Sequence, residues 1–256
     1  KQAAHLTVFQ RTPNYAIPAH NQPLDPDLVA ELRTRYDEFR AENRTMTAAF
    51  GSRIPRYDVP TLAVDDDERW EQLERRWQYG GLPFLGAFND ILLDSGANAA
   101  VAEFVRDKIR SIVRDPEVAR KLTPANVIGC KRLCVDTGYY ETFNRDNVEL
   151  VDLHDEPIER FTATGIATSG AARDFDSIVL ATGFDAMTGA LLRVDIVGRQ
   201  GVALRDAWAD GPRCYLGLQV SGFPNLFTIT GPGSPSVLTN MIVSIEHHVE
   251  WIADAI

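Results

Sequence analysis

The chain has 256 residues, of which 45% are hydrophobic and 24% are charged; this composition is typical of a globular protein with one or two domains and excludes a disordered or fibrous one. Its 26 Lys and Arg residues are outnumbered by 36 Asp and Glu residues, and the net charge of -10 argues against a general attraction to nucleic acid or anionic lipid. Apolar runs stay well short of the roughly 20 residues that cross a bilayer, and the first residues lack a secretory signal, so we predict a soluble, cytoplasmic protein.

The first predicted element is a β-strand at residues 5–9, His-Leu-Thr-Val-Phe. Since this strand begins without an earlier partner, we expect the chain to be a piece of a longer protein. Arg11 and Thr12 follow the strand, at the place where a dinucleotide-binding fold uses arginine to accommodate the 2′-phosphate of NADP. An isolated arginine in this place is more often a plain surface residue, so both interpretations stay open.

A helical block is predicted from about residue 25 to residue 115, where charged segments contain apolar residues at helical spacing. The run of carboxylates at residues 65–68 is typical of a helix start, because negative charge there opposes the helix dipole. We interpret the block as a helical insertion whose charges form a solvated face. The apolar sets are Leu28, Leu32 and Phe39; Trp70, Leu73 and Trp77; and Val101, Phe104, Val105 and Ile109.

After Pro124 the sequence predicts short strands and turns, with a β-meander that includes residues 148–151 and 158–162. Residues 178–181 and 226–229 are unbroken apolar runs, which is typical of strands buried on both faces of a parallel sheet. Each run leads into a glycine turn, and ligands bind at such carboxyl ends of strands in open α/β sheets.

The last predicted element is an amphipathic helix that extends from about residue 238 to the final residue, with apolar residues at steps of three and four. We expect Thr239 or Ser236 to cap its start. The amides at the start of this helix follow a Gly-Pro-Gly turn, so this place suits an electron-rich ligand group.

The three cysteines, Cys130, Cys134 and Cys214, are too few for a disulfide framework. No histidine or further cysteine lies at zinc-binding spacing from Cys130 and Cys134, and the five histidines form no recognisable ligand set. We therefore predict no metal site and expect buried, apolar thiols.

Two adjacent cations, Lys131 and Arg132, follow the apolar pair Val127–Ile128. Neighbouring side chains project in different directions, which would let one bind phosphate while the other faces a different group. Without other support, a solvated basic pair is the simpler interpretation.

Five stretches resemble, in the same order, the flavin-dependent Baeyer–Villiger monooxygenases, closest to the phenylacetone, steroid and cyclohexanone monooxygenases. The stretches are residues 5–15, 129–132, 139–147, 180–186 and 231–236. The resemblance covers essentially the whole chain and implies the C-terminal part of such an enzyme. The family's glycine-rich FAD motif would lie before Lys1.

The resemblance implies an α/β fold that is part of a flavoprotein with two dinucleotide-binding (Rossmann-like) domains and a helical insertion. Residues 1–14 and 128–181 would be a partial NADP-binding domain. Residues 15–127 would be the helical insertion, and residues 182–256 the C-terminal part of the FAD-binding domain.

The resemblance also implies the roles of individual residues. Arg132 would be catalytic, and no metal would take part. Three residues would bind the 2′-phosphate of NADPH: Arg11, Thr12 and Lys131. Further cofactor contacts would come from Thr182, Gly183, Gly231, Pro232, Gly233 and Met241. The ketone pocket would be lined by Ser236, Val237, Leu238 and Met241.

The implied activity is the conversion of a ketone to an ester or lactone through a C4a-peroxyflavin, with FAD and NADPH as cofactors and O₂ as co-substrate. A flavin monooxygenase that oxygenates nitrogen or sulfur is a second hypothesis. A non-catalytic nucleotide-binding fragment is a third.

Overall fold

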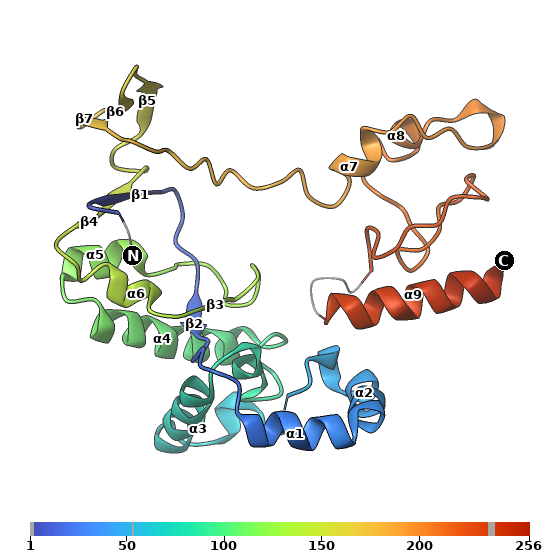
Figure 1. Ribbon diagram of the computed structural model, residues 1–256, viewed down its shortest axis with the longest axis horizontal. Helices are drawn as coiled ribbons and strands as arrows, with labels where there is room; N and C mark the ends of the chain where they lie inside the picture. The colour runs from blue at the N-terminus through green and yellow to red at the C-terminus, as the bar shows by residue number, and fades with distance from the viewer. Residues whose placement is uncertain (1–2, 53, 235–238) are drawn as a thin grey trace. The chain divides into compact units, whose positions relative to one another are not determined.

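A computed structural model describes residues 3–52, 54–234 and 239–256 (Figure 1). Its contacts divide the chain into two compact units, each assembled from two separate stretches. Unit 1 consists of Lys1–Pro23 and Arg53–Val179, and unit 2 of Leu24–Ser52 and Leu180–Ile256.

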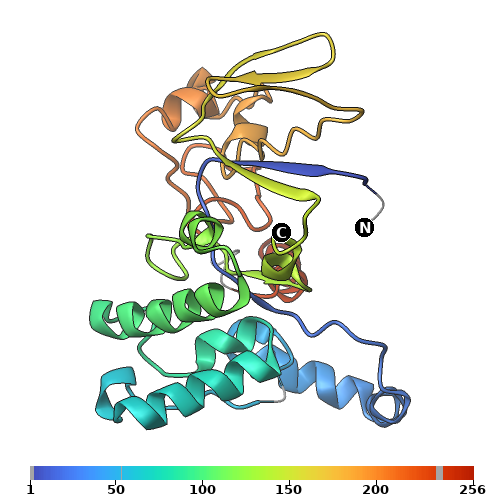
Figure 2. The ribbon, with the colours of Figure 1, turned by 90° about the vertical axis from the view of Figure 1, so that its left-hand side faces the viewer.

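The strands of unit 1 form three small sheets. Strand β1 (Leu6–Gln10) pairs in parallel with β4 (Val148–Asp152), and β2 (Ala16–Pro18) pairs in parallel with β3 (Cys134–Asp136). An antiparallel sheet is formed by β5 (Ile158–Phe161), β6 (Gly165–Thr168) and β7 (Ala172–Asp174) (Figure 2). The strands predicted near residues 5–9, 148–151 and 158–162 are confirmed within one residue.

The helices of unit 1 begin where aspartate caps stand in the sequence. Helix α3 (Asp66–Tyr79) starts at Asp65, whose Oδ1 accepts a hydrogen bond from the Glu68 amide at 2.9 Å. Helices α4 (Ser95–Ile112) and α5 (Pro116–Leu122) start in the same way at Asp94 and Asp115. The remaining helical pieces are η2 (Thr61–Ala63), η3 (Leu82–Gly86) and α6 (Tyr139–Thr142).

The main hydrophobic core lies in unit 1, where α3 and α4 pack together as the helical periodicity predicts. The predicted apolar residues of both helices are buried, except for Trp70, which is half-exposed and packs edge-on against the Phe104 ring. The predicted core residues found buried are Leu73, Trp77, Val101, Phe104, Val105 and Ile109.

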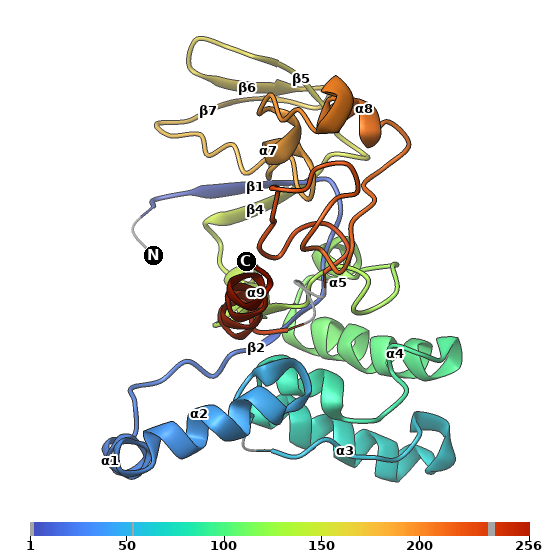
Figure 3. The same cartoon turned by 90° about the vertical axis from the view of Figure 1, so that its right-hand side faces the viewer.

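Unit 2 begins with α1 (Pro26–Thr34) and α2 (Tyr36–Thr45), followed by the short turn η1 (Thr47–Ala49). In Figure 3 α1 is seen end-on and α2 lengthwise, because the chain turns sharply at Arg35. The later stretch contributes α7 (Gly189–Leu192), η4 (Arg199–Gly201), α8 (Leu204–Ala207) and the long α9 (Met241–Ala255). A small core is formed by Leu204, Trp208, Val220 and Phe223.

The prediction of buried parallel strands at residues 178–181 and 226–229 is wrong. Residues 178–181 pair with no strand among the described residues, and Val179 is 87% exposed. In the second run, Phe227 makes a single β-bridge to Gln219, and the chain turns at Thr230, whose φ is 51°. An apolar run becomes a buried strand only where neighbouring strands satisfy its backbone groups on both edges.

The cysteines also differ from expectation. Cys130 and Cys134 are exposed, because they lie in the loop before β3 and at its first residue, outside the core, while Cys214 is half-buried; all three are free thiols. Within the described part of the chain, no three His, Cys, Asp or Glu side chains are grouped as metal ligands would be. None of the helices that the structure describes is long and apolar enough to cross a membrane.

Candidate functional site

The fold of unit 1 brings together the two basic segments that the sequence singles out. Asn14 Nδ2 donates to the carbonyl oxygen of Arg132 at 3.0 Å, although the two residues are 118 positions apart. The amide of Cys134 donates to the Tyr15 carbonyl at 3.2 Å, and the parallel pairing of β2 with β3 begins there. Arg11–Thr12 and Lys131–Arg132 therefore precede the paired region on two adjoining stretches that run in the same direction.

The four predicted side chains on these stretches are exposed: Arg11, Thr12, Lys131 and Arg132. Within the described residues, none of the four side chains has an ion-pair or hydrogen-bond partner. Each of the three cations and the hydroxyl group is thus available to an anion. Guanidinium groups bind phosphate through two parallel hydrogen bonds, and ammonium groups bind it as point charges, so these side chains suit a phosphate ligand.

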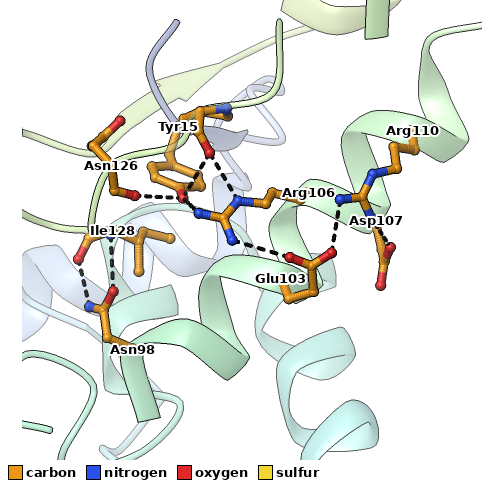
Figure 4. Close-up of polar contacts among 9 residues, drawn as sticks. Tyr15, Asn98, Glu103, Arg106, Asp107, Arg110, Asn126 and Ile128 are labelled. Carbon is orange, nitrogen blue, oxygen red and sulfur yellow. Dashed lines mark hydrogen bonds and ion pairs between the residues drawn. The ribbon is translucent and has the colours of Figure 1, made fainter. Parts of the chain in front are cut away.

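A polar network binds the segment that leads into the loop at residues 129–132 (Figure 4). The buried Tyr15 hydroxyl donates to the Asn126 carbonyl at 2.8 Å and accepts from Arg106, also at 2.8 Å. Burial raises the pKa of the Tyr15 hydroxyl, so it stays a donor. Arg106 Nε also donates to the Pro124 carbonyl at 2.9 Å, and the segment that leads into the loop is therefore held on α4.

Gly129 suits the start of that loop because of its backbone conformation. Its φ of +87° lies in the left-handed region, and an added Cβ would lie 2.5 Å from Cδ2 of Leu92. The three residues that follow it, Cys130, Lys131 and Arg132, are exposed.

In unit 2, the predicted glycine turn is closely packed at one glycine and open at the other. A Cβ at Gly231 would lie 2.5 Å from Thr228 Oγ1, whereas Gly233 has a φ of +83° and nothing within 4 Å of an added Cβ. Pro232 and Gly233 also line an open depression, together with Arg213, Cys214 and Tyr215. The turn therefore presents free space beside an exposed backbone.

The turn is connected to α9 through His248. The Thr230 amide donates to Nδ1 of this buried imidazole at 2.9 Å. Burial lowers the pKa of His248, and the charge of His247 lowers it further. A neutral imidazole with its proton on Nε2 is the form that accepts this hydrogen bond.

The residue that caps the start of α9 differs from the predicted ones. The helix begins at Met241, and Asn240 is its cap, with Oδ1 accepting from the Ile242 amide at 3.1 Å. Thr239, one predicted cap, instead donates its hydroxyl to the Ala48 carbonyl at 3.0 Å. Ser236, the other, lies outside the described residues, as do Val237 and Leu238 of the predicted ketone pocket. Met241, the remaining pocket residue, is half-buried in the first turn of α9.

Thr182 and Gly183 are exposed in an irregular stretch just after the division between the two units at Val179 and Leu180. Gly183 has a φ of +84° and no atom within 4 Å of an added Cβ. No hydrogen bond joins this pair to Gly231, Pro232, Gly233 or Met241 among the residues of unit 2 that the structure describes.

No protein-family model matches the chain. A Baeyer–Villiger monooxygenase from Pseudooceanicola batsensis is 43% identical over 257 residues, which cover 99% of this chain and 46% of that protein. The phenazine N-monooxygenase PhzNO1 from Lysobacter antibioticus is 39% identical over 259 residues, which cover 100% of this chain and 47% of that protein. The chain thus spans about half the length of the curated relatives that it matches.

The solved structures that are similar to this chain are also monooxygenases. An oxidised steroid monooxygenase bound to NADP is 52% identical with a TM-score of 0.92, covering 99% of this chain and 48% of that chain. A complex of OTEMO with FAD and NADP is 42% identical with a TM-score of 0.93, covering 99% of this chain and 47% of that chain. The chain is homologous to Baeyer–Villiger monooxygenases over nearly its whole length, which confirms the resemblance and a mixed α/β fold.

Proposed function

We propose that this chain is part of a flavin-dependent Baeyer–Villiger monooxygenase that uses NADPH and O₂ to convert a ketone into an ester or lactone. The observation that carries the proposal is the convergence of two basic segments in unit 1, joined by the hydrogen bond from Asn14 to the Arg132 carbonyl. Both segments are among the stretches that resemble this family. Residues 1–14 and 128–181 would then belong to an NADP-binding domain, and residues 182–256 to an FAD-binding domain, both Rossmann-like, with residues 15–127 as the helical insertion.

NADPH is the proposed reductant. Arg11, Thr12 and Lys131 would hold its 2′-phosphate, because their exposed donors have no partner among the described residues. Arginine binds phosphate through two parallel hydrogen bonds, and lysine adds a point charge.

FAD is the proposed redox cofactor, and when bound it supplies the hydride acceptance and oxygen activation. The open backbone at Gly233 and the start of α9 at Met241 would lie beside it. The chain's own contribution there is a fixed turn, anchored through Thr230 to His248. The proposed pocket residues Ser236, Val237, Leu238 and Met241 would keep the ketone in an apolar environment.

Arg132 is the proposed catalytic residue. Ketone oxygenation develops negative charge on oxygen, and a guanidinium stabilises that charge without losing its proton in a dry site, where a lysine would lose it more readily. Arg132 would therefore provide charge stabilisation, while Lys131 beside it would hold the cofactor.

The full-length protein carrying Arg132→Ala tests this assignment. We expect ester formation to fall by about 10²–10³-fold, the usual loss for a preorganised charge stabiliser, while NADPH oxidation continues. Gas-chromatographic product analysis beside NADPH consumption measures the two rates. Arg114→Ala, which removes another exposed arginine of unit 1, should leave both unchanged. Undiminished ester formation in Arg132→Ala would refute the catalytic role.

An N- or S-oxygenating monooxygenase is the second candidate, and the 39% identity to a phenazine N-monooxygenase favours it. Product analysis with a ketone, a phenazine and a thioether separates the two activities. Binding of NADPH without any oxygenated product would instead support a non-catalytic nucleotide-binding module. A cytoplasmic location stays a prediction from the sequence.

A further inference from the structure

The residue directly before the loop that carries Lys131 and Arg132 is bound to α4 by one buried amide side chain. Asn98 of α4, only 6% exposed, accepts through Oδ1 from the Ile128 amide at 3.1 Å. Its Nδ2 donates to the Ile128 carbonyl and to the Ile91 carbonyl, both at 2.9 Å. Figure 4 shows this two-point contact, in which a single amide satisfies both backbone groups of Ile128.

Beyond Ile128 the loop has few attachments of its own. The Cys130 amide donates to the Val127 carbonyl at 3.3 Å, and Asn126 Nδ2 lies 3.3 Å from the Cys130 sulfur. At the far end, Asn14 binds the Arg132 carbonyl. The loop is thus held at its two ends. Asn98 binds Ile128 at its start, behind the Tyr15 and Arg106 contacts to residues 124–126, and Asn14 binds its far end.

We propose that Asn98 is a positioning residue for the cation pair. By fixing both backbone groups of Ile128, it determines where the left-handed turn at Gly129 starts and hence where Lys131 and Arg132 project. This inference rests on the proposed function, because it assigns the positioning to the binding of the 2′-phosphate of NADPH. Asn98 itself touches neither cofactor nor substrate.

Loss of the Asn98 side chain leaves the Ile128 amide and two buried carbonyls without partners. Buried backbone groups in that state seek water or move towards other partners. The Asn98→Ala change therefore loosens the beginning of the loop, where Gly129 already lacks the conformational restraint of a side chain.

Gln72 offers a matched control. It is 4% exposed on α3, and its Nε2 donates to the Ala87 carbonyl at 3.0 Å. Gln72→Ala also removes a buried amide that binds backbone in the same core, but the backbone that it frees is not that of the cation loop. A merely structural role for Asn98 predicts the same behaviour for both variants.

The experiment compares Asn98→Ala and Gln72→Ala in the full-length protein by two measurements. Hydrogen exchange, followed by mass spectrometry, should be roughly tenfold or more faster at the hydrogen-bonded amides of Ile128 and Cys130 in Asn98→Ala alone. The ratio of kcat/KM for NADPH to kcat/KM for NADH should fall about tenfold in the same variant. This ratio is unaffected by the fraction of active protein.

Equal exchange in the two variants, or faster exchange with an unchanged cofactor ratio, overturns the inference. A wild-type enzyme without preference for NADPH refutes the proposed role of Lys131, and with it the functional part of this inference; the exchange data then still report whether Asn98 holds the loop. If Asn98→Ala does not fold, Asn14→Ala loosens the loop from its exposed end and should lower the same ratio by a smaller factor. An unchanged cofactor ratio in Asn14→Ala would also refute the inference that contacts at the ends of the loop position Lys131 and Arg132.

Discussion

Lys131 and Arg132 are neighbours in one loop, but their side-chain chemistry suits different tasks. A guanidinium keeps its charge in any environment, whereas an ammonium is a compact charge that binds phosphate at a single point. This difference agrees with the proposed division between charge stabilisation and cofactor binding.

The change Lys131→Ala tests the cofactor part of that division. We expect the KM for NADPH to rise by roughly tenfold or more while the KM for NADH stays nearly constant, because only NADPH carries the 2′-phosphate. Steady-state kinetics with both cofactors on the full-length protein measures the effect. An equal rise for both cofactors would contradict the assignment.

His248 has a consequence for stability at low pH. Its Nδ1 accepts from the Thr230 amide, and burial lowers its pKa. An unfolded histidine binds a proton near pH ~6.5, whereas folded His248 binds one only at lower pH. Between these two pH values the unfolded state therefore holds more protons, and stability falls as the pH falls through this range.

We expect His248→Asn to remove this part of the pH dependence, because Oδ1 of asparagine can take the place of Nδ1 as acceptor and does not titrate. Urea unfolding at pH 7 and pH 5 should show a smaller loss of stability than in wild type, by at most about 1.4 kcal/mol per pH unit. His154→Asn, an exposed histidine in unit 1, should keep the wild-type slope. An unchanged slope in His248→Asn would show that its protonation is not linked to folding.

At the scale of elements, α9 is joined to the short turn η1 by a set of hydrogen bonds. The Asn240 amide donates to the Ala48 carbonyl at 2.8 Å, and Asn240 Nδ2 donates to the Ala49 carbonyl at 3.1 Å. Both alanines have positive φ, 60° and 51°, which alanine adopts only when surrounding contacts compensate. Asn240 therefore both caps α9 and binds it to η1.

Asn240→Ala should lower the free energy of unfolding by about 1–2 kcal/mol, because it removes the helix cap and frees the Ala49 carbonyl. Asn240→Ser keeps an oxygen that can cap and should recover part of this loss. Urea denaturation of the two variants and wild type provides the comparison. Equal stability of Asn240→Ala and wild type would mean that neither bond contributes.

The elements that the sequence predicts well are those whose signal is local. Helices α3 and α4 carry both an apolar period and an aspartate cap, and α3 is therefore predictable from Asp65 to Trp77. The run 178–181 carries only apolar character, and whether it forms a strand depends on partners elsewhere. The cap of α9 was mistaken because Thr239, Ser236 and Asn240 are all suitable residue types, and the contacts of Ala48 decide among them.

At the scale of the molecule, the candidate site also combines residues with a local sequence signal and residues whose contacts depend on distant parts of the chain. The cations at residues 131 and 132 were recognisable as a motif, and the resemblance supplied their roles, which stay predictions. Asn98, Asn14 and His248 were missed, because one buried amide or imidazole has no sequence signature. Only the pairing of residues 14–18 with residues 132–136, across more than a hundred positions, reveals what Asn14 contacts.

Each unit consists of two separate stretches of the chain, so a cut between the stretches of unit 2 should leave them associated. Phe184 is 100% exposed in an irregular stretch, so limited chymotrypsin digestion should cut there. The two fragments should still elute together, because α2 binds α9 within unit 2 through Arg40 and Arg44, which pair with Glu246 at 2.8 and 3.0 Å.

In Arg44→Glu the fragments should dissociate at a lower urea concentration than in wild type, as followed by size-exclusion chromatography, because the new carboxylate faces Glu246 and Glu250. Arg33→Glu makes the same charge change at an exposed position of α1 and should leave the pair associated at that concentration. Separation of the cut wild-type fragments would show that α2 and α9 do not hold unit 2 together.

The bond between Arg44 and Glu246 also spans 202 positions of the chain. During translation at about 5–20 residues per second, the α1–α2 pair therefore leaves the ribosome roughly 10–40 seconds before its helical partner has been synthesised. For that interval the early helices lack α9, so nascent chains stalled before residue 240 should expose them to chaperones and proteases.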